Sequence, residues 1–212
     1  MPWREYASLA DVEKIVSELT WLWPNIIPNG YLTVIAGQPG IAKSAWALDL
    51  VARVLSGTPW PDGTPCKEVP FVMWADTEAT QAMLLDRAKS LGLDPARIVF
   101  PFDKDNVLGD VKLDDAAKWA AFKSSVEECS PPVVIIDSLA SAHSSDEDKS
   151  KNMNLICGRL MRLARDNNNA VIAIHQVRKQ GEEYKTELTL DDLRGSGAIG
   201  YEAKCVSVIE PV

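Results

Sequence analysis

Short segments without polar alternation recur along the chain and predict the strands of a central sheet. They are rich in Val and Ile and span residues 32–36, 71–75, 97–100, 133–136, 170–174 and 205–209. Strands that are apolar at successive positions are covered on both faces, as in parallel sheets flanked by helices.

Longer segments with helical periodicity separate these strands. They span residues 43–56, 80–91, 114–129 and 151–166, and in the last of them Leu155, Leu160 and Leu163 are spaced for one apolar face. Because strands and helices alternate, the pattern predicts an α/β fold with a mostly parallel central sheet and helices on both faces. We find no repeat or linker that divides the chain, so we expect one domain over residues 1–212, with a lead-in segment at 1–30 and the core at 31–212.

Composition narrows the possible partners and the compartment. Acidic residues outnumber basic ones 30 to 22, and the formal net charge of −8 excludes a protein whose whole surface binds a polyanion. No apolar run approaches the ~18 residues of a membrane span, and the first residues lack a signal pattern, so we expect a soluble, cytoplasmic protein. The cysteines Cys66, Cys129, Cys157 and Cys205 show no disulfide or zinc spacing, which predicts reduced, buried thiols.

The stretch GQPGIAKS, residues 37–44, lies between a predicted strand and a predicted helix. This is the context of the phosphate-binding loop GxxxxGK[ST], in which backbone N–H groups surround phosphates, the lysine reaches the outer phosphates and the hydroxyl binds Mg²⁺. A Gly/Pro turn that merely carries a lysine is the alternative interpretation. The predicted ATP phosphate ligands are Gly37, Gln38, Pro39, Gly40, Ile41, Ala42, Lys43, Ser44 and Ala45.

Ala42 departs from this motif because it stands where the pattern has glycine. If the backbone there needs a positive φ, alanine adds strain of roughly 1 kcal/mol, which is small beside a site with many donors. We therefore expect weakened rather than abolished phosphate binding.

Acidic and polar residues follow three of the other predicted strands. Asp137 ends the strand VVIID and is the candidate Mg²⁺ carboxylate together with Ser44, whereas Glu78 in WADTEAT is the candidate for polarising the attacking water. Alternatively, Asp137 caps a turn and Glu78 is a solvated acid in the first turn of a helix. His175 and Gln176 end a further strand and are candidates for sensing the terminal phosphate. With the loop upstream, the set predicts a site for ATP and Mg²⁺.

The order of these motifs resembles the RecA-like P-loop ATPase superfamily. Residues 74–94 resemble the DTE segment of RadA recombinases, residues 190–209 resemble the DLRxSGAI segment of DnaB-type helicases, and residues 21–63 are similar to the RepA-like, AAA_25-type branch of hexameric helicases. The resemblance implies a ring-forming homo-oligomer, with a hexamer favoured.

The resemblance also implies roles for individual residues. Lys43 and Ser44 would bind phosphate and Mg²⁺, Glu78 would be the catalytic base, Asp137 the metal carboxylate and His175 the coupling residue. Lys204 stands where RepA-like proteins carry an arginine that reaches the neighbouring subunit's nucleotide, and Arg194 is the other candidate for this role in trans.

Whether the chain acts on DNA is left open by its sequence. In this superfamily the loops at 141–152 and 177–190 would meet single-stranded DNA, but acidic residues balance the basic ones in both, and Tyr184 is their only aromatic residue. The leading hypothesis is a helicase or DNA replication or recombination motor acting on single-stranded DNA, with a RadA-like recombinase as a related possibility. A KaiC-like regulator or a slow or inactive ATP-binding module that acts through protein partners is the alternative.

Overall fold

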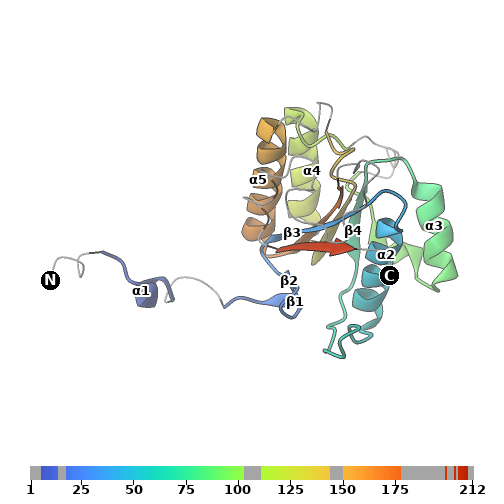
Figure 1. Ribbon diagram of the computed structural model, residues 1–212, viewed down its shortest axis with the longest axis horizontal. Coiled ribbons are helices and arrows are strands. Elements are labelled where there is room, and N and C mark those ends of the chain that lie inside the picture. Colours follow the sequence, from blue (N-terminus) through green and yellow to red (C-terminus); the bar gives the residue numbers. More distant parts are fainter. Residues whose placement is uncertain are drawn as a thin grey trace, which may run out of the picture.

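The computed structural model describes residues 6–13, 18–102, 111–143, 150–177, 199, 203 and 205–209. Its centre is a sheet flanked by helices (Figure 1). The sheet has six strands in the order β5-β4-β6-β7-β3-β8, and every pair of neighbours is parallel. The strands are β3 (Leu32–Gly37), β4 (Val72–Asp76), β5 (Ile98–Val99), β6 (Val133–Asp137), β7 (Ala170–Gln176) and β8 (Cys205–Ile209). The parallel α/β architecture predicted from the sequence is therefore confirmed.

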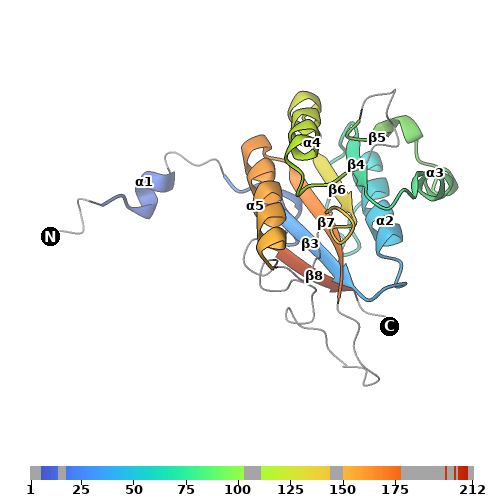
Figure 2. The same ribbon diagram turned by 90° about the horizontal axis from the view of Figure 1, so that it is seen from above.

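Four helices cover the two faces of this sheet (Figure 2). Helices α2 (Lys43–Ser56) and α3 (Gln81–Ser90) pack on one face, and α4 (Ala116–Cys129) and α5 (Ser150–Asn167) pack on the other. The predicted helices thus exist, with ends that differ by at most two residues.

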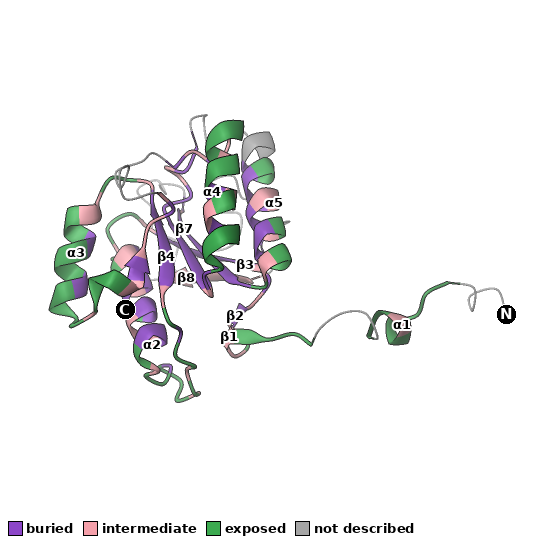
Figure 3. Cartoon of the chain, turned by 180° about the vertical axis from the view of Figure 1, so that it is seen from behind, coloured by how far each residue is buried: buried purple, intermediate pink, exposed green. Residues whose placement is uncertain are grey.

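Successive residues of a strand pack into two different hydrophobic cores, one on each face of the sheet. This explains why the strands are apolar without a break. Val34 and Ala36 pack with α4 and α5, whereas Ile35 between them packs with α2. The central strands β3, β4, β6 and β7 are buried, apart from Gln176 at the end of β7, whereas the edge strand β8 is half-buried. Exposed residues lie on the outer faces of the helices (Figure 3). Burying a side chain such as Ile35 contributes about 1.5–3 kcal/mol to stability.

The predicted apolar face of α5 is wrong at one position. Leu160 and Leu163 are buried, but Leu155 is 42% exposed. Five residues of α-helix turn about 140° past a full turn, so Leu155 cannot share a face with Leu160. Ile156 occupies the buried position instead, four residues before Leu160.

A small N-terminal hairpin precedes the sheet and was not expected from the sequence. Strands β1 (Trp21–Trp23) and β2 (Ile27–Pro28) pair antiparallel. The ring of Trp23 stacks on buried Trp60, with 4.5 Å between centroids, and Trp23 Nε1 donates a hydrogen bond to Asp62 Oδ2 at 3.0 Å. The hairpin is thereby fixed to the loop after α2. Further towards the N-terminus, α1 (Leu9–Glu13) has no buried residue.

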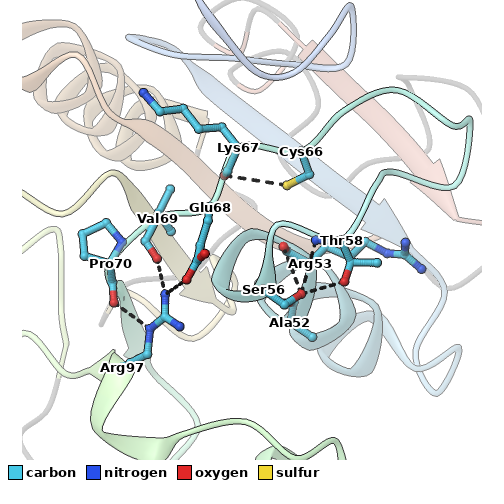
Figure 4. Close-up of polar contacts among 10 residues, drawn as sticks. All are labelled: Ala52, Arg53, Ser56, Thr58, Cys66, Lys67, Glu68, Val69, Pro70 and Arg97. Carbon is cyan, nitrogen blue, oxygen red and sulfur yellow. Dashed lines mark hydrogen bonds and ion pairs between the residues drawn. The ribbon is translucent and has the colours of Figure 1, made fainter.

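A network of hydrogen bonds holds the segment that leads into β4 (Figure 4). Arg97, at the end of the 3₁₀ helix η2 (Pro95–Arg97), donates to the carbonyl oxygen of Pro70 at 2.8 Å and to Glu68 Oε1 at 3.0 Å. The amide of Val69 donates to the carbonyl of Val54 in α2 at 2.8 Å. Because the segment is tied to α2 and to the start of β5, the entry into β4 is fixed.

Composition led to two expectations, one about membrane spans and one about the cysteine thiols. Among the helices in the described ranges, none combines the length and apolarity that crossing a bilayer requires. The expectation of buried thiols is wrong for most of the cysteines: Cys157 is buried, Cys66 and Cys205 are half-buried and Cys129 is exposed, since it ends α4 on the surface. All four thiols are free.

Candidate functional site

The carboxyl ends of four adjacent parallel strands form the floor of the site. Gly37 at the end of β3 is paired with Gln176 at the end of β7, and Asp76 at the end of β4 is paired with Asp137 at the end of β6. Open parallel sheets bind ligands at this edge. A cavity of ≈ 390 Å³ lies here, within the usual range for small-molecule sites. Its lining includes Pro39, Gly40, Ala42, Lys43, Ser44, Ala45, Trp74, Glu78, Thr80, Met83, Leu84, Arg87, Asp137, Ser138, Ile174 and Gln176.

The loop between β3 and α2 has the backbone that a phosphate-binding loop requires. Gly40 has a φ of 83° and Ala42 a φ of 60°, both in the left-handed region. Ala42 is also the N-cap of α2, and no side chain caps the helix there. The first amides of α2 therefore face the cavity without a capping side chain, an arrangement suited to an anion.

Glycine is required at the start of the loop for a different reason. A methyl group on Gly37 would lie 2.3 Å from Ile41 Cδ1 and 2.9 Å from the carbonyl oxygen of Ile209.

Three of the predicted phosphate ligands, Gly37, Gln38 and Ile41, do not line the cavity. The carbonyl groups of Gly37 and Gln38 accept hydrogen bonds from Lys43, and Ile41 packs over Gly37.

Lys43 is 8% exposed and reaches back across the loop. Its Nζ donates hydrogen bonds to the carbonyl oxygens of Gly37 at 3.0 Å and Gln38 at 2.8 Å. Burial lowers the pKa of Lys43 from its usual value, and the nearby carboxylates of Asp137 and Glu78 oppose this shift. The ammonium group is thus placed between the loop and the acidic side of the cavity.

Asp137 faces the loop from the end of β6. Burial raises its pKa to about 6, the charges of Glu78 and Asp76 act in the same direction, and a hydrogen bond from Ser44 and the charge of Lys43 act against them. A carboxylate in contact with a hydroxyl offers the hard oxygen ligands that Mg²⁺ prefers. Among the described residues no group of three or more His, Cys, Asp or Glu could hold a metal. The pair fits Mg²⁺ that takes its other ligands from water and phosphate.

Glu78 lies in the turn between β4 and α3. Its Oε1 accepts hydrogen bonds from Ser138 Oγ at 2.6 Å and Ser141 Oγ at 3.2 Å. Asp76 shapes this turn, because its carboxylate accepts from the amides of Glu78 at 3.0 Å and Thr80 at 2.7 Å. The carboxylate of Glu78 therefore lines the cavity opposite the loop.

Thr77 joins the ends of β4 and β6. Its hydroxyl donates to the carbonyl of Ser138 at 2.8 Å and accepts from the amide of Ser138 at 2.7 Å, and its amide donates to the carbonyl of Asp137 at 2.9 Å. The segments that carry Glu78 and Asp137 are consequently held in fixed relation.

His175 and Gln176 occupy opposite faces of β7. Gln176 lines the cavity, whereas His175 is fully buried and does not line it. Its cross-strand partner is Ala36, which packs with α4 and α5 on the face away from α2. The structure thus brings Lys43, Ser44, Glu78, Asp137 and Gln176 together but does not bring His175 into the cavity. The predicted contact of His175 with the terminal phosphate is therefore not supported, because its side chain lies on the face of β7 away from the cavity.

Several predicted features lie outside the described residues. These are Arg194, Lys204 and most of the two loops at 141–152 and 177–190. Conversely, Asp76, Ser141 and Arg87 were not among the named site candidates: Arg87 lines the cavity, whereas Asp76 and Ser141 hydrogen-bond to Glu78. Arg87 follows Thr80 by seven residues, so helical periodicity was the signal that could have found it.

A protein-family model described as "AAA domain" (AAA_25) matches residues 4–182. The chain belongs to the AAA domain family. This confirms the expected P-loop ATPase domain, and the matched range contains the phosphate-binding loop, Glu78, Asp137 and Gln176. ATP binding is expected for a domain of this family. Comparison with curated proteins finds no match.

Replacing Ala42 with glycine is expected to stabilise this AAA domain. The left-handed φ of 60° costs alanine about 1 kcal/mol, part of which returns as the greater entropy of the unfolded glycine chain. We expect a net gain of roughly 0.5 kcal/mol in the free energy of unfolding, measured by denaturant titration. Ala52→Gly, in the middle of α2, is the matched control and should destabilise by about 1 kcal/mol. A loss of stability in Ala42→Gly would contradict the strain at this position.

Asp137→Asn is expected to stabilise the Mg²⁺-free protein in a pH-dependent way. The folded-state pKa of Asp137, about 6, lies above the ordinary aspartate value of 3.8, so the native state binds its proton more tightly than the unfolded state. Wild-type stability should therefore fall as pH rises between about 4 and 6, whereas the amide has no charge to bury. In EDTA at pH 7.5 the variant should gain up to about 3 kcal/mol, and the gain should vanish near pH 4. A pH-independent difference would be inconsistent with a buried carboxylate.

Proposed function

We propose that the chain binds Mg²⁺-ATP in this cavity and hydrolyses it. The observation that carries the proposal is the convergence of Lys43, Ser44, Glu78, Asp137 and Gln176, from four different strand ends, on one cavity of ≈ 390 Å³. A turn that carried a lysine by chance would not face two carboxylates from neighbouring strands. Each member has the chemistry that phosphoryl transfer to water requires.

The phosphates would lie against the first amides of α2. Lys43 would exchange its bonds to the loop carbonyls for bonds to the outer phosphates, as a compact cation with three donors can do. Ser44 and Asp137 would hold Mg²⁺, which neutralises charge on the phosphates when bound. The side of α3 that carries Met83, Leu84 and Arg87 offers apolar and cationic surface for the rest of the nucleotide.

Glu78 is the residue we assign to the attacking water. Its carboxylate lies in the cavity opposite the loop, and the hydrogen bonds from Ser138 and Ser141 limit its rotation. A positioned carboxylate can orient a water and accept its proton as the bond to phosphorus forms. Gln176 ends β7, between β3 and β6, and lines the cavity, where it would contact the terminal phosphate.

We further propose that hydrolysis drives a motor on single-stranded DNA. The support is the resemblance of residues 21–63 to RepA-like helicases and of residues 190–209 to DnaB-type helicases. In this proposal the chain assembles into a homo-oligomeric ring, a hexamer being favoured, and DNA meets the loops at 141–152 and 177–190. Lys204 or Arg194 would contact the nucleotide of a neighbouring subunit, and His175 would link β7 to the loop that follows it.

Two substitutions separate nucleotide binding from hydrolysis. Glu78→Gln keeps the shape and a hydrogen-bond acceptor but removes the base, so it should retain ATP binding and lower turnover by at least about 10²-fold. Lys43→Ala removes the cation from the phosphate end and should lose binding. Binding is measured with a fluorescent ATP analogue and turnover by phosphate release. Unchanged turnover in Glu78→Gln would overturn the assignment of Glu78.

A motor on DNA predicts hydrolysis that responds to single-stranded DNA. We expect stimulation at low salt that fades at moderate salt, because DNA contacts release counterions. The measurement is phosphate release with and without an oligonucleotide, with the oligomeric state recorded in the same buffer. Hydrolysis indifferent to DNA would instead favour a nucleotide-dependent regulator that acts through protein partners.

A further inference from the structure

The catalytic carboxylate is held by the segment that follows β6. Both hydroxyl groups that contact Glu78 donate to the same oxygen, Oε1: Ser138 at 2.6 Å and Ser141 at 3.2 Å. A glutamate side chain rotates about three bonds, so one contact alone leaves its end free to swing. Two donors on one oxygen fix where the carboxylate group lies in the cavity.

Ser138 and Ser141 have different surroundings. Ser138 is buried, lines the cavity and directly follows Asp137. Ser141 is half-buried and does not line the cavity, so a bound nucleotide would not meet its hydroxyl directly. Any effect of Ser141 on the reaction would therefore pass through Glu78.

The backbone around Ser141 is anchored from three directions. Its amide donates to the carbonyl of Ser138 at 3.2 Å and closes a tight turn. The amide of Leu139 donates to the carbonyl of Ile174 in β7 at 2.7 Å, and Lys112 Nζ donates to the carbonyl of Ser141 at 2.8 Å. Leu139 is itself fully buried. A hydroxyl on such a fixed turn can position a partner, since its own location is set by the fold.

We propose that Ser141 is a positioning residue for Glu78, and this rests on the function proposed above. With Ser138 it holds Oε1 in place and directs the carboxylate towards the water that attacks the terminal phosphate. Ser141 does not line the cavity and acts through Glu78. Its contribution is to kcat, because orientation of the base matters during the reaction and not when ATP binds.

The test compares wild type with Ser141→Ala and Ser141→Thr. We expect Ser141→Ala to lower kcat about tenfold, with the KM for ATP and the binding of a fluorescent ATP analogue unchanged. Ser141→Thr keeps the hydroxyl and should recover most of the lost rate. A serine with only a structural role would change the melting temperature and would not give this kcat-specific loss with rescue.

Ser124→Ala is the matched control. Ser124 Oγ also donates to a glutamate, Glu128 Oε1 at 2.8 Å, but on the exposed surface of α4 away from the cavity. The kcat of Ser124→Ala should equal that of wild type.

The outcomes distinguish the two proposals. If Glu78→Gln abolishes turnover and Ser141→Ala behaves as wild type, or raises kcat, the role of Ser141 is wrong and the proposed function stands. A rise in KM with unchanged kcat, or failure of threonine to restore the rate, also overturns the positioning role. If wild type does not hydrolyse ATP, or Glu78→Gln leaves turnover intact, the proposed function fails and the role of Ser141 fails with it.

Discussion

The close approach of buried carboxylates at the end of the sheet is the constraint on which the site depends. Parallel pairing of β4 with β6 places Asp76 directly beside Asp137, and these residues are only 2% and 6% exposed. Two buried carboxylates repel each other and lose their hydration, so each needs hydrogen bonds or an opposite charge nearby. Asp76 is compensated by the amides of Glu78 and Thr80, whereas Asp137 depends on Ser44 and Lys43 from the phosphate-binding loop. The acidic side of the cavity and the loop thus stabilise each other across the sheet edge.

The backbone is strained at two residues close to these charged groups. Ala42 and Ala79 both have a positive φ, 60° and 56°, although alanine rarely adopts this conformation. Ala42 directly precedes Lys43 and Ser44, and Ala79 directly follows Glu78. At each place the left-handed residue lies next to a residue that lines the cavity. Strain of about 1–3 kcal/mol at such positions persists because the surrounding hydrogen bonds and packing hold the backbone.

The sequence predicts the sheet well because each strand is apolar throughout and each connecting helix is periodic. It also predicts Lys43, Ser44, Glu78 and Asp137 as candidates, since these follow strand ends in a recognisable order. The hairpin β1–β2 was missed because strands of three and two residues carry too little periodicity to detect. Ser141 was missed for another reason: its partner Glu78 lies 63 residues away, and only strand register brings the two together. His175 shows the reverse case, in which alternation along β7 directs a promising side chain away from the cavity.

The net negative charge of the chain would oppose the binding of an anion such as ATP, and the proposed site would offset this repulsion locally. With a net charge of −8, the protein repels an anion such as ATP at long range, although salt at physiological strength screens this repulsion beyond about 8 Å. Within the cavity, the amides of α2 and the ammonium of Lys43 are concentrated on one side, and carboxylates face them from the other. A polyphosphate alone would meet those carboxylates unfavourably, whereas a phosphate with Mg²⁺ attached presents a cation to them. In the proposed function the buried acids would therefore favour a metal-bound nucleotide, because the ion would satisfy the same charge that makes Asp137 costly to ionise without it.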